Sequence, residues 1–91
     1  MELTSLDKAI ILTLYVRGGR SKKAHFPIEF IYMGFPSHLS GKIKKRVIKL
    51  KRGGYIYVKP HPSGVSYGLT GEGWRVAQEL EEDANKKADV T

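Results

Sequence analysis

Basic side chains crowd the stretch SGKIKKRVIKLKR at residues 40–52, where seven of the thirteen residues are lysine or arginine. Cations at this density repel one another, so they favour an anionic partner outside the chain. Between Phe30 and Gly71 there is no Asp or Glu, and the carboxylates gather near the two ends of the sequence. Together with a net charge of +7, this segregation indicates a surface that binds a polyanion.

Other kinds of chemistry find little support in the sequence. The histidines His25, His38 and His61 lie far apart and no cysteine accompanies them, so we expect no metal site. No serine occupies a nucleophile-elbow pattern. The stretch GEGWRV at 71–76 lacks the third glycine of a dinucleotide-binding motif. We therefore expect neither an enzyme nor a bound cofactor.

Length and composition predict one small domain. A chain of 91 residues can bury a hydrophobic core without the help of disulfides or bound metals. The absence of cysteine excludes disulfides and fits a reducing compartment. The apolar run from Ala9 to Val16 is too short to span a membrane, and no basic segment precedes it as in a signal peptide. We expect a soluble cytoplasmic protein.

Capping residues, together with glycine and proline stops, predict three helices in the first half of the chain. They are expected at about 6–17, 27–33 and 40–52. The first cap is Thr4 or Ser5, and the third is Ser40 in preference to Ser37. The segment RSKKAH at 20–25 is expected to be a polar, basic loop between the first two helices.

The third expected helix has a buried side and a charged side. Ile43, Val47 and Leu50 form its apolar stripe at helical spacing. At 100° per residue, the cations that point away from this stripe or flank it are Lys42, Lys44, Lys45, Lys49 and Arg52. Arg46 lies beside the stripe. Ile48 falls on the charged side, where packing against a neighbouring helix is favoured over contact with thymine methyl groups.

A β-hairpin and a last helix are expected after residue 54. The strands are predicted at Tyr55 to Pro60 and Val65 to Leu69, joined by the turn HPSG at 61–64. Thr70 caps a helix to about Ala84, with an apolar face around Trp74, Ala77 and Leu80. The fold class is therefore mainly α with a small hairpin, in one domain at 1–84 followed by a flexible polar tail at 85–91.

This order of elements resembles a winged helix-turn-helix domain, in which three helices form the core and the hairpin forms a wing. The stretch from 40 to 84 is similar to the recognition helix, wing and following helix of MarR-like and related prokaryotic regulators. Leu69, Thr70 and Gly73 in LTGEGW match the leucine-threonine-x-x-glycine signature of that group. The front part matches by element order alone, and its segment FPIEFIYMGFPSHLS at 26–40 is more aromatic than usual.

The resemblance implies a transcriptional regulator whose third helix enters the major groove of duplex DNA while the wing contacts the adjacent backbone. The implied nucleic-acid contacts are Lys42, Lys44, Lys45, Arg46, Lys49, Arg52, Lys59, His61 and Ser63. The reading positions hold lysines and no Asn, Gln or Ser, which favours phosphate binding over base reading and modest sequence specificity. If about five phosphates are neutralised, the logarithm of affinity falls with that of salt at a slope of about −4 to −5.

Three other readings of the same charges stay open at this point. An RNA-binding or ribosome-associated winged-helix protein would use the same cations against a different backbone. A protein-interaction module would use the cations to bind an acidic protein partner. In the simplest alternative, the cations form a solvated surface that binds no partner. The resemblance also implies a homodimer formed through terminal helices, and the broad apolar face of 74–84 favours it. A DNA-binding protein of this kind is expected with the nucleoid.

Overall fold

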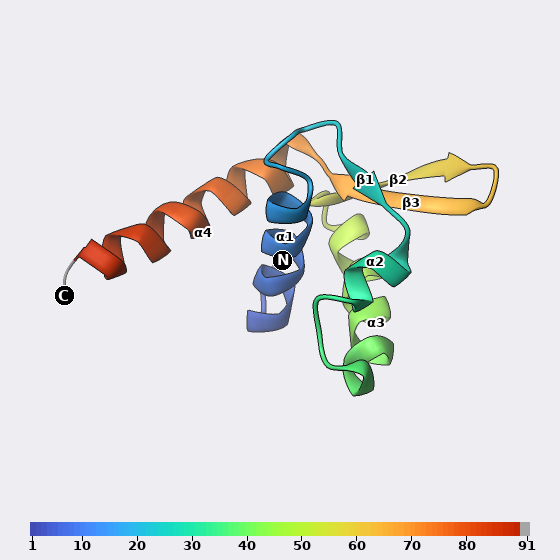
Figure 1. Cartoon of the computed structure of the whole chain (residues 1–91), viewed down its shortest axis with the longest axis horizontal. Coiled ribbons are helices and arrows are strands. Elements are labelled where there is room, and N and C mark those ends of the chain that lie inside the picture. The colour runs from blue at the N-terminus through green and yellow to red at the C-terminus, as the bar shows by residue number, and fades with distance from the viewer. Residues whose placement is uncertain (90–91) are drawn as a thin grey trace.

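The computed structural model describes residues 1–89, and within them the chain forms four α-helices, one 3-10 turn and three strands (Figure 1). The elements are α1 (Ser5–Arg17), β1 (His25–Phe26), α2 (Ile28–Tyr32), the 3-10 turn η1 (Ser37–Leu39), α3 (Ser40–Arg52), β2 (Ile56–His61), β3 (Gly64–Leu69) and α4 (Gly71–Asp89). Three helices, a hairpin and a C-terminal helix follow in the predicted order, so the winged-helix fold class is confirmed. No helix in this part of the chain is both long and apolar enough to cross a membrane.

The N-termini of α1 and α3 are stabilised in different ways. At α1, the Thr4 side chain accepts a hydrogen bond from the backbone of Asp7, and the Asp7 carboxylate accepts one from the backbone of Thr4. At α3 the prediction of a serine cap was wrong, because the N-cap is Leu39 and it makes no side-chain cap bond. The 3-10 turn runs directly into this helix, and the Ser37 carbonyl accepts from both the backbone N–H and the hydroxyl of Ser40.

The sheet has three antiparallel strands in the order β1-β3-β2, one strand more than the sequence predicts. In the hairpin, the register runs from Ile56 opposite Leu69 to His61 opposite Gly64, and the strand bounds lie within one residue of the predicted ones. Gly64 has a φ of 137°, which only glycine adopts readily at the end of the turn. The extra strand β1 lies at the end of the segment predicted as a polar loop. A strand of two residues is too short to show the alternation by which strands are recognised.

The leucine-threonine-x-x-glycine motif joins the sheet to α4. The hydroxyl of Thr70 accepts a hydrogen bond from the backbone of Gly73, as predicted for a cap, and also donates one to the carbonyl of Gly54. A Cβ added at Gly73 would lie 2.0 Å from the carbonyl oxygen of Tyr55, so the start of α4 packs against the backbone just before β2 more closely than a side chain would allow. The motif therefore fixes the wing relative to the last helix.

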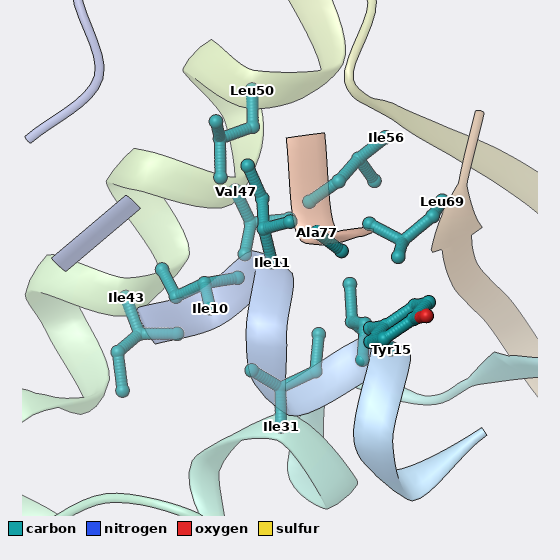
Figure 2. Close-up of a cluster of buried hydrophobic side chains, with 11 residues drawn as sticks. Ile10, Ile11, Tyr15, Ile31, Ile43, Val47, Leu50, Ile56, Leu69 and Ala77 are labelled. Carbon is teal, nitrogen blue, oxygen red and sulfur yellow. The ribbon is translucent and has the colours of Figure 1, made fainter. Parts of the chain in front are cut away.

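The core lies where α1, α2, α3 and the base of the hairpin meet (Figure 2). Its fully buried apolar side chains are Ile10, Ile11, Ile31, Ile43, Val47, Leu50, Ile56 and Ala77. Ala77 is the contribution of α4, which then leaves the domain on the side away from α3 and the hairpin (Figure 1). This helix continues to Asp89, so the end predicted near Ala84 was too early. Glu82 with Lys86 and Asp83 with Lys87 stand four residues apart, a spacing that supports a helix.

Candidate nucleic-acid interface

The α3 helix turns its cations outward. Ile43, Val47 and Leu50 are buried as predicted, and they attach one side of the helix to the core. The exposed cations on the remaining sides are Lys42, Lys44, Lys45, Lys49, Lys51 and Arg52. Lys51 joins this group without having been predicted for it, although its place on the helical wheel, two turns after Lys44 on the same side, was a signal that could have found it.

Arg46 differs from the other cations of α3, because its guanidinium is engaged within the protein. Its Nε and one terminal nitrogen each lie 2.7 Å from an oxygen of Asp7, which is fully buried in α1. Burial by itself raises the pKa of Asp7, but the hydrogen bonds from Arg46 and Thr4 outweigh it and hold that pKa below its usual value. The hydrogen bonds that Arg46 donates to Asp7 also raise the pKa of Arg46. This arginine links α3 to α1 and is turned away from the exposed side.

Ile48 is 44% exposed, so the prediction that it packs against a neighbouring helix was wrong. Ile48 instead lines a hollow of about 440 Å³ between α3 and the hairpin. The walls are Val47, Ile48, Lys51, Arg52, Val58, Val65 and Tyr67. The sequence shows the residues of this hollow but not that they face one another.

The other predicted contact residues lie on the hairpin, at or near its tip. Lys59 is exposed on β2, and His61 and Ser63 lie at the tip. The Nδ1 atom of His61 accepts a hydrogen bond from the backbone of Ser63 at 3.3 Å and lies 2.8 Å from its hydroxyl oxygen. The tip is therefore ordered by its own side chains.

Three acidic residues of α4 form ion pairs with arginines outside α3. Glu81 forms an ion pair with Arg20 at 2.5 Å, and Arg75 forms ion pairs with Glu72 and Glu79 on its own helix. Within residues 1–89, Arg46 is the one cation of α3 that is paired with a carboxylate. The exposed side of α3 consequently keeps its positive charge unneutralised. The same residues contain no group of three His, Cys, Asp or Glu side chains placed to hold a metal ion.

A solved structure of BpsR from Bordetella bronchiseptica, a protein whose DNA binding is regulated by 6-hydroxynicotinic acid, is similar to this chain with a TM-score of 0.70. The two sequences are 14% identical, and the match covers 97% of this chain and 64% of the BpsR chain. The likeness is one of fold, and this chain spans less than two thirds of its neighbour. No protein-family model and no characterised protein sequence matches this chain.

Proposed function

We propose that this protein is a DNA-binding transcriptional regulator that inserts α3 into the major groove and sets its wing on the adjacent backbone. The observation that carries the proposal is the exposed side of α3, where six cations face solvent without a carboxylate partner among the described residues. A major groove about 12 Å wide admits one helix of this kind. The similarity in fold to BpsR, a protein that binds DNA, supports DNA binding by this chain.

The proposed contacts follow from exposure. On α3 they are Lys42, Lys44, Lys45, Lys49, Lys51 and Arg52, and on the wing they are Lys59, His61 and Ser63. Arg46 is left out, because its guanidinium is bound to Asp7. Lysines act on phosphate as point charges and carry no sequence information, so most of the affinity is independent of sequence. Such a protein acts on the chromosome and belongs in the cytoplasm with the nucleoid.

We also propose that the protein is a homodimer joined through α4. After Ala77, its last buried residue, this helix continues for about three turns. Val76, Leu80 and Ala84 stand at intervals of four residues along it, and Ala84 is exposed. In sedimentation equilibrium we expect about twice the chain mass of 10.2 kDa for the wild type and the single-chain mass for Leu80→Glu. A wild-type protein that sediments with the single-chain mass at tens of micromolar would contradict the proposed dimer.

Binding to labelled duplex DNA at physiological salt, with unlabelled duplex RNA and single-stranded RNA as competitors, tests the proposed function. We expect a complex that duplex DNA displaces at lower concentration than either RNA, because the helix enters a wide major groove and A-form RNA has a narrow one. If either RNA displaces the labelled DNA at lower concentration than duplex DNA does, the protein is an RNA-binding protein and not a transcriptional regulator. If the protein binds neither duplex DNA nor either RNA, the exposed cations would instead bind an acidic protein partner.

A further inference from the structure

The apolar side chain of Ile48 stands in the middle of the proposed DNA-binding side of α3. Its neighbours at three and four residues before and after, which share its side of the helix, are Lys44, Lys45, Lys51 and Arg52. All four are exposed cations. Ile48 belongs neither to the core nor to the side chains packed against it, and it is 44% exposed. The fold of the single chain therefore gives this isoleucine no packing role in the core.

The hollow beside Ile48 extends this apolar surface toward the wing. Val58 is half-buried and Val65 is 46% exposed, and both line the same space of about 440 Å³. Lys51 and Arg52 stand at its margin. An apolar floor with cationic edges is complementary to a small apolar group carried between phosphates. It is not complementary to a neutral apolar partner, which would leave the cations desolvated.

Within duplex DNA, one group has this character. The 5-methyl group of thymine is the one methyl group that an unmodified base pair presents in the major groove; cytosine has only a hydrogen at that position, with an amino donor beside it in place of the thymine O4. Isoleucine can cover a methyl group but cannot accept a hydrogen bond, so an amino group placed against it would lose water without a partner. Apolar contact at this position consequently discriminates between bases, which the surrounding lysines do not.

We infer that Ile48, with the hollow between α3 and the hairpin, binds the 5-methyl group of a thymine and gives the protein its preference among DNA sequences. The inference rests on the proposed function, since it requires α3 to lie in the major groove. Burial of one methyl group corresponds to about a four-fold change in affinity. We therefore expect a preference of about four-fold for each thymine methyl that reaches the hollow.

The test compares duplexes that differ only in the methyl group. Wild type and Ile48→Ala are titrated at one salt concentration into alternating dA·dT and dA·dU duplexes, and into dG·dC duplexes with cytosine or 5-methylcytosine. We expect wild type to bind each methylated duplex about four-fold more tightly than its unmethylated partner. Ile48→Ala should bind both members of a pair equally, with Ile48→Val retaining the preference because it keeps a branched apolar side chain.

The matched control is Val16→Ala, which shortens an apolar side chain that is 49% exposed on α1 and should keep the wild-type preference. Thermal unfolding should show the same midpoint for Ile48→Ala and wild type, since Ile48 is outside the core. Equal affinity of wild type for methylated and unmethylated duplexes, or an undiminished preference in Ile48→Ala, would overturn the inference and leave DNA binding in place. Failure of wild type to bind any of the duplexes would instead remove the proposed function.

Discussion

Substitution of Asp7 by alanine tests how α3 is held with its cations outward. Asp7 is fully buried and bonded through both oxygens to Arg46, and removing one partner of a buried ion pair costs about 3–5 kcal/mol. The Arg46 side chain keeps 21% exposure, so a guanidinium left alone can recover part of its hydration. We therefore expect Asp7→Ala to lower the free energy of unfolding by about 3 kcal/mol. In a domain of this size, that is a fall of about 12–24 °C in Tm.

Urea and thermal unfolding followed by circular dichroism measure this loss, with Asp83→Ala on the exposed side of α4 as the matched control. The control should change stability by less than about 0.5 kcal/mol. An Asp7→Ala loss no larger than that of the control would refute the buried ion pair, because exposed pairs contribute about 0–1 kcal/mol.

Acid unfolding gives the same prediction a second readout. The folded pKa of Asp7 lies below its unfolded value, so its contribution is complete above the unfolded pKa, near pH 4, and is lost as the pH falls through the folded pKa. Wild type should therefore lose more stability than Asp7→Ala on acidification below about pH 4. A constant difference between the two proteins down to pH 2 would contradict the lowered pKa.

The remaining predictions concern Arg46 and the motif before α4. The double variant Asp7→Leu/Arg46→Met should recover most of the stability lost in Asp7→Ala, because it leaves no unpaired charge, and it should keep the wild-type salt dependence of DNA binding. A slope for the double variant that is shallower than that of the wild type by about one unit would show that Arg46 contacts DNA phosphate. Gly73→Ala should destabilise the protein by about 3 kcal/mol or more, because its Cβ would lie 2.0 Å from the Tyr55 carbonyl oxygen. Gly71→Ala, where a Cβ meets nothing within 4 Å, should leave Tm unchanged or raise it, and equal melting of the two variants would contradict the close approach at Gly73.

Much of the fold could be predicted because local signals decided it. The Thr4 and Thr70 caps, the spacing of the α3 core stripe and the turn at Gly64 each depend on residues close in sequence, and each is confirmed. The strand β1 was missed and the N-cap of α3 was assigned to the wrong residue, because both depend on backbone partners that leave no mark on residue type. The C-terminal part of α4 was taken for a tail on account of its polarity, although a helix that extends away from its domain needs little apolar surface.

The site was predicted less completely than the fold. The helical wheel identifies the outward cations correctly, but it cannot show that Arg46 meets Asp7, which is 39 residues away in sequence. Ile48 was predicted to pack against a neighbouring helix, but it is 44% exposed and lies beside the hairpin. The hollow beside it combines α3 with both strands of the wing. Long-range proximity decides all three features, and residue type and spacing do not encode it.

The salt dependence of duplex DNA binding tests most directly whether the exposed cations of α3 bind phosphate. We expect a log–log slope of about −4 to −5 per subunit for the wild type, twice that when both subunits of the proposed homodimer are bound, and a slope shallower by about two units per subunit for Lys45→Ala/Lys49→Ala. Lys86→Ala/Lys87→Ala, which removes the same charge from the far end of α4, should keep the wild-type slope. If the Lys45→Ala/Lys49→Ala slope coincides with that of the wild type, these lysines do not touch the DNA backbone and the account of α3 is wrong.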